Sequence, residues 1–423
     1  TEALISARRP ALAITELSVM QPVLLKPDIY WVGAVDYNLR NFHHYSRSPL
    51  GSTYNAYLVR DEKTVLFDTV SAHYYDELVE HISAVVEPCK IDYIVCNHLE
   101  QDHSGALPRI VELCRPEKIF VSPLGQKSIT GIFNTEGWPI EVVKDGDRLN
   151  IGRRNITFLE TRMLHWPDSM VSYLEEDKVL ISNDIFGQNV ATSRRFVDEY
   201  DRSLLLRAMK DYYYNIVLPY SPMTLKALDR IASLGLQFDV IAPDHGLIFR
   251  TQEDIDFVIR SYREFAEQKP KLQAVIAYDT MWSATERMAC AVGDGLDDEG
   301  VPYLLIDMQH NHYSAVMNAL ADSGALILGS STRNNMPMVN MVALMAHVKG
   351  LKPQNLVGAS FGAYGWSGEA PKMMAEELKA MKVDVVGEPL KVAFAPKADD
   401  LAKARALGAE VGRALKEKIK NFQ

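Results

Sequence analysis

Apolar residues in the first 267 positions occur mainly as short runs, which predict strands. Runs of this kind lie at residues 55–59, 64–67, 91–96, 118–121, 156–160, 179–182 and 240–242. The segments 76–86 and 106–114 instead carry apolar residues at the spacing of an amphipathic helix. Strands joined by helices in this order predict a layered α/β sandwich.

A charged segment that contains a proline, residues 267–271, precedes a more regular pattern. Strand-like runs at 272–278, 303–306, 325–328, 355–359 and 391–394 alternate with helical patterns at 285–296, 336–349, 370–381 and 401–419. Five parallel strands with helical crossovers are typical of a doubly wound, flavodoxin-like sheet. Since single cores rarely grow beyond ~250–300 residues, we predict two domains, at 1–267 and 271–423.

Composition and charge argue against several classes of protein. The formal net charge is −10, from 45 basic and 55 acidic residues, whereas a nucleic-acid binder needs a basic surface. No apolar run approaches the ~18 residues of a membrane span. Residues 1–10 lack the apolar core of a secretory signal. The four cysteines form no CxxC pair, so we interpret them as reduced thiols of a cytoplasmic protein.

The densest group of polar side chains is the segment His98-Leu-Glu-Gln-Asp-His103, directly after a predicted strand. A loop leaving a strand can aim alternate side chains at one point, and its carboxylates repel one another unless a cation holds them together. The alternative is a polar loop in which Asp102 or Ser104 caps the next helix. That alternative gives no reason for two imidazoles and two carboxylates in six residues. We therefore expect His98, Glu100, Asp102 and His103 to bind metal.

Three further candidate ligands, His165, Asp184 and His245, each lie just beyond the carboxyl end of a predicted strand. Such strand ends are where α/β sheets gather their sites. A single histidine there is more often structural, but their common placement favours one shared site. Seven ligands without a thiolate suit two metal ions that share a bridge, and Asp184 is the natural bridging carboxylate.

The order His-x-Glu-x-Asp-His, followed by separate His, Asp and His, resembles the pattern of the metallo-β-lactamase superfamily. Most hydrolases of that superfamily carry histidine as the second ligand, whereas this sequence has Glu100. In this it is similar to the flavodiiron proteins, and the likeness covers nearly the whole chain, including residues 163–170 and 180–188. Relatives differ in whether the histidine at position 98 coordinates iron. The resemblance implies one iron held by His98, Glu100, His165 and Asp184, and a second held by Asp102, His103, Asp184 and His245.

A second group of candidate residues follows the first strand beyond residue 271. The segment 279–285 opens a helix, and the hydroxyls of Thr280, Ser283 and Thr285 with free backbone N–H groups could cradle a phosphate. The absence of a glycine-rich dinucleotide fingerprint favours a mononucleotide such as FMN. Alone, this loop could equally be an ordinary helix N-terminus.

Two later loops, 329–335 and 360–368, supply amides, small residues and aromatic rings that suit a flat isoalloxazine. Together the three loops resemble the FMN site of flavodoxins and, more closely, that of flavodiiron proteins. Two positions depart from some relatives: Ala284 lacks a hydroxyl, and Ser331 stands where proline is common. The expected FMN-binding residues are Thr280, Met281, Trp282, Ser283, Ala284, Thr285, Ser331, Thr332, Arg333, Asn334, Asn335, Ser360, Phe361, Gly362, Ala363, Tyr364, Gly365, Trp366 and Ser367.

By this resemblance, electrons enter at FMN and pass to a diiron centre that reduces dioxygen to water, nitric oxide to nitrous oxide, or both. The same ligands would serve either gas, so the sequence does not rank the two. One alternative is a dinuclear metallo-hydrolase of the metallo-β-lactamase superfamily, which would hold two zinc ions. A second is a non-catalytic FMN electron-transfer module with a vestigial metal site.

The resemblance also implies partners. Some relatives carry a fused rubredoxin module with CxxC pairs, which this chain lacks. We therefore expect a separate rubredoxin as electron donor, with a reduced deazaflavin or another flavoprotein as alternatives. Subunits of the family pair head to tail, so we also expect a homodimer or a dimer of such dimers.

Overall fold

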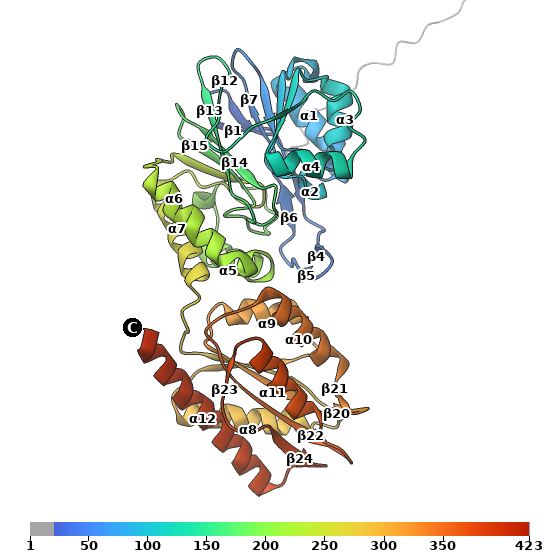
Figure 1. Cartoon of the computed structure of the whole chain (residues 1–423), viewed down its shortest axis with the longest axis vertical. Helices are drawn as coiled ribbons and strands as arrows, with labels where there is room; N and C mark the ends of the chain where they lie inside the picture. The colour runs from blue at the N-terminus through green and yellow to red at the C-terminus, as the bar shows by residue number, and fades with distance from the viewer. Residues whose placement is uncertain (1–20, 423) are drawn as a thin grey trace, which may run out of the picture.

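The computed structural model describes residues 21–422, and their strands form two successive arrangements (Figure 1). The prediction that no secretory leader is present concerns residues 1–10, which lie outside the described residues. Among residues 21–422, no helix combines the length and apolar character needed to cross a membrane.

The first arrangement contains two sheets. Seven strands in the order β1-β2-β7-β8-β9-β10-β11 form one sheet, and five in the order β12-β13-β14-β15-β16 form the other. The first sheet comprises β1 (Val23–Lys26), β2 (Ile29–Trp31), β7 (Tyr57–Val59), β8 (Val65–Phe67), β9 (Tyr93–Cys96), β10 (Lys118–Val121) and β11 (Ile140–Val142). The second comprises β12 (Arg148–Asn150), β13 (Asn155–Glu160), β14 (Met170–Leu174), β15 (Val179–Asn183) and β16 (Val240–Pro243).

Helices cover the outer faces of both sheets. Their bounds are α1 (Tyr75–Val85), α2 (Gln101–Ser104), α3 (Leu107–Cys114), α4 (Pro123–Ile132), α5 (Arg202–Tyr212), the π-helix η4 (Tyr213–Val217), α6 (Ser221–Ser233) and α7 (Gln252–Glu267). Short 3₁₀ turns are η1 (Ala72–Tyr74), η2 (Pro88–Lys90), η3 (Val197–Glu199) and η5 (Leu218–Tyr220). Two small antiparallel pairs, β3 (Ala34–Asp36) with β6 (Ser52–Tyr54) and β4 (Asn41–Phe42) with β5 (Ser46–Arg47), complete this part.

Alternation along the strands produces the layers. In β8, Val65 and Phe67 point into the apolar core between the two sheets, whereas Leu66 joins the core under α1, α3 and α4. In β13, Phe158 faces the inter-sheet core and Leu159 faces α5, α6 and α7. Successive side chains of a strand point to opposite faces, so each sheet buries both faces. The predicted layered α/β sandwich is confirmed.

The second arrangement is a parallel sheet in the order β18-β17-β19-β22-β23, with β24 also paired to β22. Its strands are β17 (Ala274–Asp279), β18 (Tyr303–Asp307), β19 (Ala325–Ser330), β22 (Val357–Tyr364), β23 (Asp384–Val385) and β24 (Leu390–Ala393), and β20 (Thr332–Arg333) pairs with β21 (Met336–Pro337). Helices α8 (Ala284–Asp298) and α12 (Ala398–Phe422) pack on one face of the sheet. Helices α9 (Tyr313–Leu320), α10 (Val339–Leu351) and α11 (Ala370–Ala380) pack on the other. This is the doubly wound sheet that the sequence predicted.

Several details of the second arrangement differ from the sequence-based prediction. The helix expected from residue 336 begins at Val339, because Met336 and Pro337 pair with the preceding strand β20. The strand expected over 355–359 instead runs from Val357 to Tyr364. Helix α9 was not predicted, since its eight residues give too short a periodic pattern.

The two arrangements touch through helices α9 and α10, which pack against α5 and η4 (Figure 1). His347 of α10 lies with Nε2 3.1 Å from Oδ1 of Asn215 in η4. The Lys210 ammonium of α5 pairs with Asp322, beyond α9, at 2.6 Å. One apolar core runs through this junction. Together these contacts fix how the two parts of the chain sit on each other.

Candidate metal centre and flavin-binding loops

All seven metal ligands expected from the sequence meet at the carboxyl ends of the strands of the sandwich. His98 and Glu100 lie in the turn between β9 and α2, and Asp102 and His103 lie on α2. The other three come from loops that begin at strand ends: His165 after β13, Asp184 after β15 and His245 after β16. Parallel pairing of β8, β9 and β10, and of β15 with β16, brings these strand ends to one edge.

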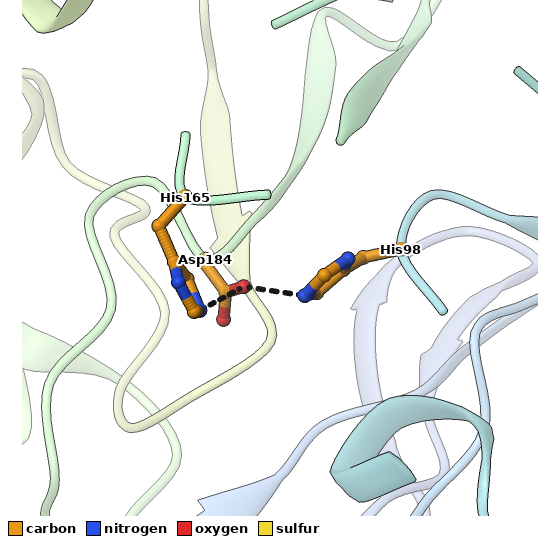
Figure 2. Close-up of side chains that lie close together, drawn as sticks. All are labelled: His98, His165 and Asp184. Carbon is orange, nitrogen blue, oxygen red and sulfur yellow. Dashed lines mark ion pairs between the residues drawn. The ribbon is translucent and has the colours of Figure 1, made fainter. Parts of the chain in front are cut away.

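Asp184 divides the cluster into two groups. Its Oδ2 lies 3.5 Å from Nε2 of His98 and 3.4 Å from Nε2 of His165. Figure 2 marks these two pairs with dashed lines. Glu100 completes this group, because its Oε2 lies 3.3 Å from the same atom of His98 and 3.2 Å from that of His165. Two imidazoles and two carboxylate oxygens therefore face one point.

The other oxygen of Asp184 faces the second group. Its Oδ1 lies 3.2 Å from Nε2 of His103 and 3.5 Å from Nε2 of His245. Asp102 completes this group, with Oδ1 3.5 Å from the His103 nitrogen and Oδ2 3.2 Å from the His245 nitrogen. One carboxylate thus aims an oxygen at each of two sets of ligands.

Several of these atoms are buried without a hydrogen-bond partner. Both oxygens of Asp102, Oδ2 of Asp184, both ring nitrogens of His103 and Nε2 of His245 are in this state. Buried polar groups are almost always hydrogen-bonded, and leaving one unpaired costs about 1–3 kcal/mol. Oxygen and nitrogen atoms that face a common point but form no hydrogen bonds fit a pair of metal ions.

Burial and neighbouring charges shift the pKa values of residues in the cluster. Burial alone would lower the pKa of His98, but hydrogen bonds to Asp168 and Glu100 outweigh it and raise the value to about 10. The pKa of His103 is likewise raised, because Asp102 and Asp184 outweigh burial. Burial would raise the pKa of Asp102, but His103 and His245 hold it at about 2. The carboxylates are therefore charged and available as ligands at neutral pH.

Contacts behind the cluster orient its members. Nδ1 of His245 lies 2.7 Å from the backbone oxygen of Thr53, which leaves Nε2 turned to the site. The Tyr212 hydroxyl donates a 2.9 Å hydrogen bond to Oδ1 of Asp184. Sequence reasoning did not find Tyr212, because it comes from helix α5 and no local pattern marks it.

Two further polar residues lie against the cluster. Nε2 of His43 lies 3.1 Å from Oε1 of Glu100. Asp244 was also missed, although it directly precedes His245. Its Oδ2 lies 3.5 Å from Nδ1 of His103. Its position next to a predicted ligand was the sequence signal that could have identified Asp244.

The predicted flavin loops gather at the carboxyl edge of the parallel sheet. The first lies between β17 and α8, the second leaves β19, and the third leaves β22. Ser331 braces two of these segments, because its Oγ accepts a 3.0 Å hydrogen bond from the Met281 N–H and lies 2.9 Å from Oγ1 of Thr285. The phosphate-cradle loop is therefore tied to the second loop.

The third segment is more regular than expected. Residues 360–364 continue strand β22 instead of forming a loop, and Phe361 is fully buried with its ring against Gly329. The loop proper begins at Gly365. The side chains of Trp282 and Trp366 are 96% and 87% exposed, so two large aromatic rings stand free at this edge of the sheet.

Comparison with protein families matches both parts of the chain. The model described as "ODP family beta lactamase" matches residues 53–246, and the flavodoxin model matches residues 276–408. The first match contains all seven clustered residues, and the second contains the three flavin loops.

Individual relatives match over nearly the full length. The chain is 48% identical to the rubredoxin-oxygen oxidoreductase of Megalodesulfovibrio gigas, over 95% of this chain and 100% of that protein. It is 41% identical to the nitric oxide reductase of Moorella thermoacetica, over 92% of this chain and 98% of that protein. Among solved structures, the flavodiiron protein of Giardia intestinalis superposes with a TM-score of 0.91 at 32% identity, over 95% and 98% of the two chains.

Proposed function

The chain belongs to the flavodiiron protein family, and we propose that it passes electrons from FMN to a diiron centre that reduces dioxygen to water, nitric oxide to nitrous oxide, or both. The observation that carries this proposal is the arrangement around Asp184, whose two oxygens face two separate sets of ligands. Bound iron and FMN together would supply the four electrons that complete reduction of dioxygen requires.

The geometry supports a specific assignment of ligands. One iron would be held by His98, Glu100, His165 and Asp184, and the other by Asp102, His103, Asp184 and His245. All seven side chains supply oxygen or nitrogen, which suits iron better than a soft metal. Of the alternatives, the hydrolase is not favoured, because two relatives that match nearly the whole chain are named as an oxygen oxidoreductase and a nitric oxide reductase.

The protein's own residues hold these ligands in place before any ion enters. Thr53 accepts from the ring of His245, and Tyr212 donates to Asp184. Both contacts are buried and exclude water from the rear of the site. A preorganised set of donors avoids reorganisation when charge develops in the reaction.

The names of two relatives support a proposal for the gases and for the electron donor. One similar protein is named for oxygen reduction with rubredoxin, and another for nitric oxide reduction. We propose that this chain reacts with both gases and takes electrons from a separate rubredoxin. A reduced deazaflavin or another flavoprotein is the alternative donor.

We also propose a head-to-tail homodimer in the cytoplasm, with the diiron domain at 1–267 and the FMN domain at 271–423. Within one chain, the second part contacts the first through α9 and α10 on one face of its sheet. The flavin loops lie instead at the carboxyl edge of that sheet, where Trp282 and Trp366 are exposed. A second copy placed against this edge would cover both rings and bring its own metal centre to the flavin.

The test combines composition with reactivity. Purified protein should contain two irons and one FMN per chain, and anaerobically reduced protein should be reoxidised in stopped-flow mixing with dioxygen and with nitric oxide. Asp184→Ala should abolish this reoxidation at the metal while FMN stays bound. Protein that holds only zinc, or that neither gas reoxidises, would refute the proposal.

A further inference from the structure

Asp168 is a buried carboxylate that the sequence reasoning did not include among the functional residues. It lies in the loop between β13 and β14, and its side chain is 0% exposed. Its Oδ1 is 3.2 Å from Nδ1 of His98, and its Oδ2 accepts a 3.1 Å hydrogen bond from the Leu99 N–H. The Ser122 hydroxyl donates to its backbone oxygen at 2.7 Å. Both carboxylate oxygens thus have fixed partners.

We propose that Asp168 is a positioning residue that makes His98 a metal ligand by fixing its tautomer. A carboxylate only accepts hydrogen bonds, so the ring of His98 must carry its proton on Nδ1. With the Nδ1 proton held by Asp168, only Nε2 is left to bind a metal ion, and it faces Oε2 of Glu100 and Oδ2 of Asp184, where that ion would sit. This inference rests on the proposed diiron centre, in which His98 would hold the first iron.

The surroundings of the ring leave it no second orientation. The indole of Trp166 lies edge-on to His98 with ring centroids 5.1 Å apart, and the ring is fully buried. Turning the imidazole over would place carbon atoms against Asp168 and Glu100, which removes both polar contacts. Partners of this kind on metal-bound histidines set tautomer and ring orientation. The structure therefore holds His98 ready for a metal on one nitrogen only.

The decisive variant is Asp168→Asn, which keeps the shape of the side chain. The amide oxygen can still accept from the Leu99 N–H, and this bond turns the amide NH₂ toward His98. An NH₂ group donates, so the imidazole must now accept at Nδ1 and carry its proton on Nε2. That proton occupies the position of the metal, and we expect affinity for cobalt(II), added to metal-free protein, to fall about 10–100-fold.

Two controls separate positioning from packing. Ser122→Ala removes the hydrogen bond to the backbone of Asp168 but leaves its carboxylate, so cobalt affinity should stay within about twofold of wild type. His98→Ala and the double variant His98→Ala/Asp168→Asn should bind cobalt equally weakly, because a residue that acts through His98 adds nothing once His98 is gone. FMN content and the melting temperature of the metal-free protein are measured for every variant.

Wild-type cobalt affinity in Asp168→Asn would overturn the inference, as would an additive loss in the double variant or an equal loss in Ser122→Ala. If Asp168→Asn loses FMN or melts early, ¹⁵N-imidazole spectra of the zinc-loaded wild type decide instead. A proton on Nδ1 of His98 supports the inference, and a proton on Nε2 refutes it. Wild-type protein that binds no pair of metals would refute the proposed function, which is a distinguishable outcome.

Discussion

Helices α8 and α12 approach each other more closely than side chains permit, and two glycines make this possible. A Cβ added to Gly408 of α12 would lie 1.9 Å from the backbone oxygen of Val292 in α8. A Cβ added to Gly295 of α8 would lie equally close to the backbone oxygen of Arg405 in α12. Neither obstacle is a flexible side chain. Gly408→Ala must therefore push the helices apart.

The size of this effect follows from the distances. Ordinary contact begins at 3.4 Å, so relief requires a separation of about 1.5 Å. Overpacking of this kind costs about 3 kcal/mol, against which alanine gains about 1 kcal/mol of helix propensity over glycine. The net loss of about 2 kcal/mol lowers the melting temperature of a domain of ~150 residues by about 4–8 °C. Since α8 begins at the predicted phosphate cradle, FMN should also dissociate more readily.

Calorimetry and the FMN content of dialysed protein measure both effects. Gly350→Ala is the matched control, because Gly350 lies in α10 with nothing within 4 Å of the added Cβ. It should leave the protein unchanged or stabilise it by about 0.5–1 kcal/mol. The close-packing argument would be refuted if Gly408→Ala had the melting temperature of the wild type, or if Gly350→Ala were destabilised as much as Gly408→Ala.

Two further predictions concern the flavin loops and the junction between the two parts. Ser331→Ala removes the hydrogen-bond acceptor of the Met281 N–H and the hydroxyl contact of Thr285, which costs about 1–3 kcal/mol. The Kd for FMN, measured by fluorescence, should therefore rise at least fivefold. Ser330→Ala keeps both Ser331 contacts and is the control. Burial, with the charge of His312, lowers the pKa of His347 to about 4, below the ~6.5 of an unfolded chain. The unfolded state thus binds the proton first, and wild-type stability should fall between pH 6.5 and 4. His347→Gln should flatten that decline in thermal melts, and parallel curves would contradict this.

The sequence was sufficient to predict that seven candidate ligands converge, because each of them follows a predicted strand. His165, Asp184 and His245 lie far apart in the chain, but parallel strands end at one edge, so their order alone brings them together. The fold class of both parts follows from the same alternation of strands and helices. These features depend on the spacing of apolar residues and on the order of strands and helices, and a single sequence contains both.

Residues behind the ligands could not be predicted in the same way. Asp168 contacts His98 across 70 positions of the chain, and Tyr212 reaches Asp184 from a helix that covers the second sheet. Such contacts depend on how layers pack, not on local pattern. Strand β22 was predicted too short for a related reason: Ser360–Tyr364 contain small and polar residues typical of loops, but pairing with β24 extends the strand.

The histidines and carboxylates that face one another in the candidate metal centre have a consequence for its assembly. Neighbouring carboxylates raise the pKa of His98 to about 10 and also raise the pKa of His103, so a cation that binds to these imidazoles displaces protons. Metal uptake therefore acidifies an unbuffered solution, and acid drives the reverse reaction. Loading of this protein with iron is thus an exchange of metal for hydrogen ions, whose equilibrium shifts with the pH of the surrounding solution.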